Sequence, residues 1–140
     1  MRLDQELRRV AEAAGRHCGE AEELAGIVPA EAGRGGRLYV CAYREGENTS
    51  WLVLDAGGHA VEDRSLVRDA VSIAALYELA EEAVGLGEES EPRVATTSAL
   101  DSLGESAPDR TAFAAAMQQA TGTVEELVRD VERGYKRPLR

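Results

Sequence analysis

The spacing of apolar residues changes twice along this chain, and that change constrains the fold more than any other feature. Up to about residue 26 and again after residue 63, apolar side chains recur every three or four positions, as in a helix that buries one side. Between residues 37 and 63 they alternate with a period of two, as in a strand. A helix, a group of strands and then further helices predict an α+β fold.

The first element is predicted to be an amphipathic helix over about residues 3–26. Pro29 and the glycine-rich run at residues 33–36 are expected to end it. Charged residues occupy the opposite side of this helix. The apolar stripe consists of Leu3, Leu7, Val10, Ala14, Cys18, Ala21 and Leu24.

Residues 37–63 predict a short antiparallel sheet of two or three strands. Trp51–Leu54 is apolar on both faces, so we expect it to be the central strand, covered on both sides. Gly57-Gly58 suits a tight turn, after which residues 59–62 would return as a third strand. In the first strand, Leu38, Val40 and Ala42 share one face, and Tyr39, Cys41 and Tyr43 share the other.

A long apolar central helix is predicted from Asp63, as its N-cap, to about Val84, before Gly85. Its middle turns are apolar almost all round, which predicts burial on more than one side, by the sheet or by a second subunit.

Residues 85–108 predict a mobile connection with one short helix at about residues 95–103. Ser106–Asp109 has the form of a capping box that opens a C-terminal helical segment. Thr121-Gly122 is expected to divide this segment, giving one broken or two short helices before Gly134. The length of 140 residues favours a single domain, residues 1–140.

Composition excludes several classes of function. With 26 acidic and 16 basic residues the net charge is -10, which argues against a nucleic-acid partner. The sequence contains no run of roughly 18 apolar residues, the length that a membrane-spanning helix needs. Its first 25 residues also lack the apolar core of a secretion signal, so we expect a cytoplasmic protein. The residues suited to soft metals, His17, Cys18, Cys41 and His59, lack metal-site spacing. We therefore expect free thiols, no metal and no cofactor.

One short segment resembles a known structural unit. The residues Leu54-Asp55-Ala56-Gly57-Gly58-His59-Ala60-Val61 are similar to the strand–turn–strand hairpin of PAS-type sensor domains. The resemblance covers under a tenth of the chain. It implies a tight hairpin and carries no function.

The favoured functional hypothesis is a non-catalytic interaction or accessory protein. It rests on the near absence of catalytic motifs and on a central helix more apolar than a small monomer needs. Such a protein would form a homodimer through the central helix, the sheet or both, and could bind a further protein partner. We expect no enzyme activity on this hypothesis.

Two alternatives remain open at the level of sequence. A small-molecule sensor or carrier would line a pocket between sheet and helix with the rings of Tyr39, Tyr43, Trp51 and Tyr77. A small enzyme would use an acidic site near the second turn for acid–base chemistry or for a divalent cation. That site would consist of Asp55, His59, Glu62 and Asp63.

Overall fold

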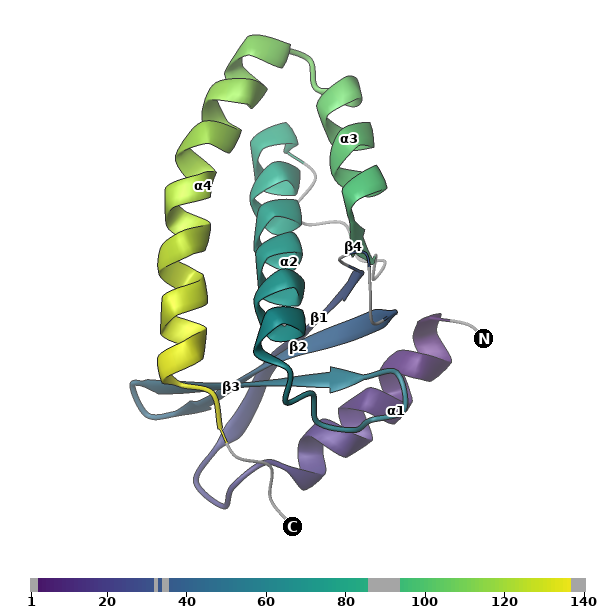
Figure 1. Cartoon of the computed structure of the whole chain (residues 1–140), viewed down its shortest axis with the longest axis vertical. Coiled ribbons are helices and arrows are strands. Elements are labelled where there is room, and N and C mark those ends of the chain that lie inside the picture. The colour runs from purple at the N-terminus through teal and green to yellow at the C-terminus, as the bar shows by residue number, and fades with distance from the viewer. Residues whose placement is uncertain (1–2, 32, 34–35, 86–93, 137–140) are drawn as a thin grey trace.

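The computed structural model describes residues 3–31, 33, 36–85 and 94–136. Its elements are α1 (Leu3–Arg16), β1 (Glu23–Glu31), β2 (Arg37–Glu45), β3 (Asn48–Asp55), α2 (Arg64–Val84), β4 (Ala95–Thr96), α3 (Thr97–Ser106) and α4 (Arg110–Arg133) (Figure 1). The strands form one mixed sheet in the order β3-β2-β1-β4, in which β4 runs parallel to β1 and the other pairs are antiparallel. The α+β prediction is confirmed.

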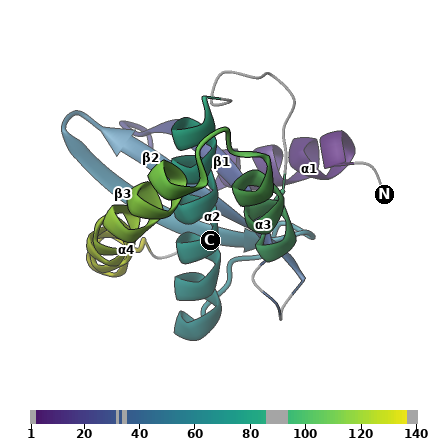
Figure 2. The ribbon, with the colours of Figure 1, turned by 90° about the horizontal axis from the view of Figure 1, so that it is seen from above.

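The sheet separates two apolar cores, one under each layer of helices. Leu38 and Val40 of β2 pack in the core shared with α2, α3 and α4. Tyr39, Cys41 and Tyr43 point to the opposite face and pack against α1. The two faces predicted for this strand from its alternation are therefore confirmed. Figure 2 shows α3 and α4 on either side of α2.

The predicted first helix was too long, because α1 ends at Arg16 and residues 23–31 form strand β1. Helical spacing continues past Arg16 by coincidence, whereas Gly15 and Gly19 weaken a helix there. Pro29 lies inside β1, opposite Tyr39. It is tolerated because β4 borders β1 only at its last two residues, so β1 is an edge strand at Pro29.

Strand β3 lies at the edge of the sheet and not at its centre, where the sequence placed it; β2 lies between β1 and β3. Its predicted burial on both faces is nevertheless correct, since Leu52, Val53 and Leu54 are fully buried. The predicted third strand at residues 59–62 is only a short return. It is held by a bridge between Ala60 and Leu54 and by the Val61 N–H, which donates to the Val53 carbonyl oxygen at 2.8 Å.

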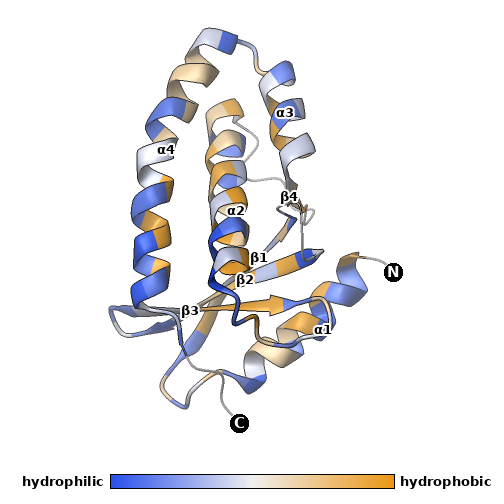
Figure 3. Ribbon diagram, in the orientation of Figure 1, coloured by the Kyte–Doolittle hydropathy of each residue, from blue (hydrophilic) through white to orange (hydrophobic). Residues whose placement is uncertain are grey.

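Helix α2 agrees closely with its prediction. The Asp63 carboxylate accepts from the N–H groups of Ser65 and Leu66, and Gly85 ends the helix at a φ of 83°. The buried side chains of α2 share one core with the sheet, α3 and α4. Figure 3 shows the apolar residues of α2 (orange) on the helix that lies between α3 and α4. The apolar character of α2 is therefore largely accounted for by packing within one chain.

The short helix predicted at about residues 95–103 is confirmed by α3, which follows the two-residue strand β4. Residues 86–93 of the predicted mobile connection lie outside the described part. Helix α4 begins after Asp109, which is its N-cap in place of the predicted Ser106. It runs unbroken through Thr121-Gly122, so the predicted break was wrong. Burial of Ala120 and Val124 against the rest of the fold outweighs the roughly 1 kcal/mol helix penalty of one glycine.

Candidate interaction surfaces

The four aromatic residues predicted to line a pocket lie in different parts of the fold. Tyr39 and Tyr43 are completely buried under α1, whereas Tyr77 is buried in the core on the other side of the sheet. Trp51 is half-buried beside Gly134, at the edge of that second core. The structure therefore does not bring these rings around one cavity.

The two phenols under α1 use their hydroxyl groups within the fold. Tyr43 donates to the Ala14 carbonyl oxygen at 2.7 Å, and Tyr39 donates to the buried carboxylate of Glu6. Glu6 also accepts from Arg37 Nη1 at 3.1 Å. Burial raises the pKa of both phenols well above the usual range, so both remain neutral and bonded at physiological pH. These contacts fix α1 against the sheet.

The predicted acidic site consists of residues that support a turn and a helix end. Asp55 accepts from the backbone N–H groups of Gly57 and His59, both at 2.9 Å, and its carboxylate lies 3.4 Å from His59 Nδ1. Asp63 caps α2. Glu62 is exposed beside it. The carboxylates of Asp55 and Asp63 thus hold backbone groups in place.

The residues suited to metals or to nucleophilic chemistry are dispersed. Within residues 3–31, 33, 36–85 and 94–136, no three His, Cys, Asp or Glu side chains gather as they would around a metal ion. Cys18 and Cys41 are free thiols, as predicted. Burial raises the pKa of Cys41 to about 12, so this thiol stays protonated and unreactive near neutral pH.

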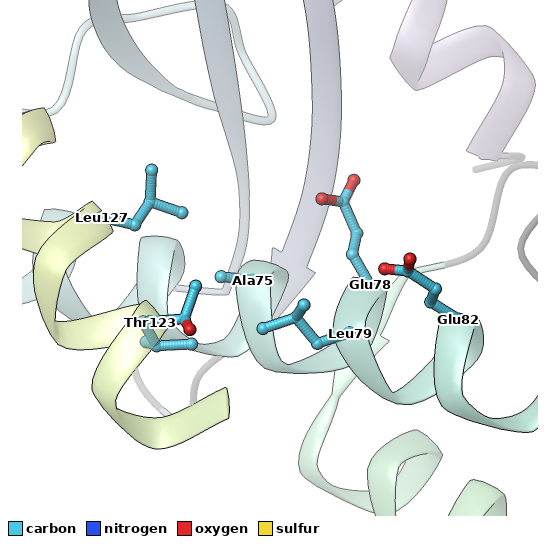
Figure 4. A pocket seen from close by; sticks show the side chains of 7 residues that line it. Ala75, Glu78, Leu79, Glu82, Thr123 and Leu127 are labelled. Atoms are coloured by element: carbon cyan, nitrogen blue, oxygen red, sulfur yellow. The ribbon is translucent and has the colours of Figure 1, made fainter. Parts of the chain in front are cut away.

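A groove between α2 and α4 is a candidate binding site. It has a volume of about 190 Å³. In Figure 4, Leu79 and Ala75 of α2 face Thr123 and Leu127 of α4 across the groove, and the Glu78 and Glu82 carboxylates extend from α2 on one side of it. Val124 completes the lining. The groove therefore combines an apolar floor with an acidic rim.

The second surface is the side of α4 turned away from α2, over the N-terminal half of that helix. The sequence has no charged residue between Arg110 and Glu125, and in this half only Ala120 is buried. Figure 1 shows this half rising beyond the sheet. We call the exposed residues here the outer face of α4: Thr111, Ala112, Ala114, Ala115, Gln118, Gln119, Thr121 and Gly122.

The C-terminal segment, Gly134–Lys136, fixes the far end of α4 to the sheet. The Trp51 N–H donates to the Gly134 carbonyl oxygen, and the Lys136 N–H donates to the Trp51 carbonyl oxygen, each at 2.9 Å. The Tyr135 hydroxyl donates to the Val61 carbonyl oxygen at 2.6 Å and accepts from the Val53 N–H at 3.0 Å. The segment therefore pairs with β3 through one bridge, between Trp51 and Tyr135, and fixes the C-terminal end of α4 there.

Lys136 continues this attachment to the loop that follows α1. Its ammonium group lies 2.5 Å from Glu22 Oε1 and 2.6 Å from the His17 carbonyl oxygen, and 3.8 Å from the centre of the Tyr43 ring. Glu22 also accepts from Ser50 at 2.8 Å. The bond from Lys136, followed by the Gly19 N–H, lowers the pKa of Glu22 from 4.5 to about 2.

This depressed pKa predicts a loss of stability in acid. Because Glu22 is more acidic in the folded chain, its contribution is complete above pH 4.5 and disappears as the pH falls toward 2. We expect the free energy of unfolding to fall by about 1–2 kcal/mol from this group over that window. Urea unfolding at several pH values measures this change in stability. Glu22→Gln should flatten the dependence of the free energy of unfolding on pH, whereas Glu20→Gln, a control at an exposed position, should leave that dependence unchanged. An unchanged slope in Glu22→Gln would contradict the assignment.

Comparisons with known proteins give no indication of function, so the functional proposal rests on the geometry of the structure. No family model matches this chain, and no curated protein or solved structure matches it either. Among the helices of the described residues, none is both long enough and apolar enough to cross a membrane.

Sequence reasoning did not single out either surface. The groove depends on which turns of α2 and α4 pack together. Its residues are far apart in the sequence, so no local sequence pattern indicates it. The outer face of α4 did leave a signal, because an uncharged run from Thr111 to Thr123 is unusual in so acidic a chain. That run was interpreted only as part of a C-terminal helical segment.

Proposed function

We propose that this chain is a non-catalytic interaction or accessory protein that forms a homodimer through the outer face of α4. The observation that supports it is an exposed helix face without charges on a chain of net charge -10. Two acidic copies repel each other over most of their surfaces, and an uncharged patch removes that repulsion locally. A two-fold contact also requires a patch that pairs with itself, which one helix face can do.

The shape of the outer face suits contact between two helices. Its small side chains, such as Ala112 and Ala115, let a second helix approach closely. The uncharged half of α4 extends for roughly 20 Å at 1.5 Å per residue, enough for several turns to meet. The sequence suggested α2, the sheet or both as the contact. Because α2 and both faces of the sheet pack mainly within their own chain, we assign the contact to α4.

For the class of partner and the location in the cell, we propose the same as the sequence predicted. The charge balance favours a protein over a nucleic acid as any further partner. We place the protein in the cytoplasm. The carrier hypothesis has less support, because the four aromatic side chains it requires lie in separate parts of the fold. The enzyme hypothesis also has less support, because the carboxylates of Asp55 and Asp63 accept hydrogen bonds from backbone N–H groups.

Ala115→Glu tests the proposed homodimer. It places a carboxylate on each side of the two-fold contact, where burial and like charge oppose association, so the dissociation constant should rise at least about tenfold. Sedimentation velocity at micromolar concentration should show a dimer for the unmodified chain and a monomer for Ala115→Glu.

Ala11→Glu is the matched control, because Ala11 is an exposed helical alanine on α1, far from α4 in the fold. It should remain dimeric. Circular dichroism should show that both variants fold, since each site is exposed. A monomeric unmodified chain, or equal dimerisation of both variants, would refute a dimer through α4.

A further inference from the structure

We propose that the groove between α2 and α4 binds a basic amphipathic helix of a partner protein, with one large apolar side chain of that helix in the groove and its cationic side chains against the rim. This inference deepens the proposed function, because it names the chemistry of a partner. It uses the side of α4 that faces α2, whereas the proposed dimer uses the outer face.

The size of the groove suits a side chain better than a free small molecule. Its volume of about 190 Å³ is below the roughly 300–1,000 Å³ of typical small-molecule pockets. A cavity of about 150 Å³ is enough to hold a benzene ring, so one leucine or phenylalanine side chain fits. The floor that would contact it consists of Ala75, Leu79, Val124 and Leu127.

The position of the groove suits a helical occupant. It runs between two packed helices, and Figure 4 shows side chains from both contributing to its walls. Amphipathic helices commonly bind such grooves by inserting apolar residues spaced three or four positions apart. Leu79 and Leu127 are only half-buried in the free chain, so an occupant would complete their burial.

The charge of the rim selects the partner. Glu78 and Glu82 line the groove, and none of the lining residues is basic. Partial burial raises the pKa of Glu78, and the neighbouring carboxylate of Glu81 raises it further. A lysine or arginine brought beside Glu78 would relieve this unfavourable environment.

Other occupants fit less well. A second copy of this chain is a poor occupant, because its net charge of -10 is of the same sign as the rim. A nucleic acid is repelled for the same reason. Complementarity of charge therefore favours a cationic helix over both.

The probe for this proposal is a capped amphipathic peptide with leucine at every third or fourth position and lysine elsewhere. Isothermal titration should show binding to the unmodified chain. A peptide of the same charge with serine in place of leucine should bind at least about tenfold more weakly, because it lacks the apolar anchor.

Two double variants with the same change in net charge then locate the binding site. Glu78→Gln with Glu82→Gln should weaken binding of the leucine peptide at least about tenfold. Glu45→Gln with Glu47→Gln, at exposed positions at the end of β2 and in the turn after it, should change it less than about twofold. Equal weakening by both pairs, or equal binding of the serine peptide, would show general charge attraction and overturn the proposal, as would no binding at all.

The same titration separates this proposal from the dimer. Ala115→Glu should bind the leucine peptide as well as the unmodified chain does, since Ala115 does not line the groove. The oligomeric state is measured by sedimentation without peptide. Failure of the dimer proposal would therefore be seen in sedimentation, and failure of the groove proposal would be seen in the peptide titration.

Discussion

Replacing Lys136 with methionine should lower the free energy of unfolding by about 3 kcal/mol, because it leaves the Glu22 carboxylate largely buried without its cation. The Lys136 and Glu22 side chains are only 11% and 16% exposed. Methionine preserves much of the apolar stem that packs near Tyr43, so the loss reports mainly on the charge. Urea unfolding monitored by circular dichroism measures this free energy. The slope of the free energy against urea concentration should not change, which would show that the unfolded state is the same in both proteins.

Two further variants make the Lys136 result specific. Arg9→Met removes a cation from an exposed position on α1 and should change stability by less than about 0.5 kcal/mol. The double variant of Lys136→Met with Glu22→Gln should be less destabilised than the sum of the two single variants, because no unpaired charge remains. Strict additivity would mean that Lys136 and Glu22 do not interact in the folded chain.

The second large effect is expected at Gly58, in the turn that follows β3. Gly58 has a φ of 84°, and a Cβ at this position would lie 2.8 Å from the Ala13 Cβ of α1. Gly58→Ala should therefore combine about 1 kcal/mol of backbone strain with about 2 kcal/mol of overpacking against α1. The expected total is about 3 kcal/mol by urea unfolding.

Gly85 offers a control with nearly the same backbone conformation. Its φ is 83°, and among the residues that the structure describes a Cβ there would have no neighbour within 4 Å. Gly85→Ala should therefore show only the backbone strain, about 1 kcal/mol. Equal destabilisation of the two variants would mean that α1 does not pack on this turn as described.

Local rules predicted the elements whose signals are complete within a few residues. Asp63 and Gly85 mark the ends of α2 because capping and left-handed geometry depend on adjacent backbone groups. The alternation in β2 predicted two buried faces because each side chain points to one side only. These predictions needed no knowledge of distant contacts.

Predictions failed where distant contacts decide the outcome. Strand β1 contains Gly26 and Pro29, which argue against a strand, yet pairing with β2 along its length stabilises it. Gly122 suggested a broken helix, but buried Ala120 and Val124 on either side keep α4 continuous. The Lys136–Glu22 pair joins residues at opposite ends of the chain, so no local pattern could reveal it.

The groove and the outer face of α4 were missed for related reasons. The outer face could have been recognised from its lack of charge once α4 was taken as one helix. The groove required the relative placement of α2 and α4, which periodicity does not supply.

The central claim is that this chain works by association with a protein, first with a second copy of itself. A native mass spectrum of the unmodified chain at micromolar concentration, recorded beside a denaturing one, tests it most directly. The account predicts a mass of twice the chain with nothing added. A monomer, or a reproducible extra mass from a metal or an organic molecule, would contradict it.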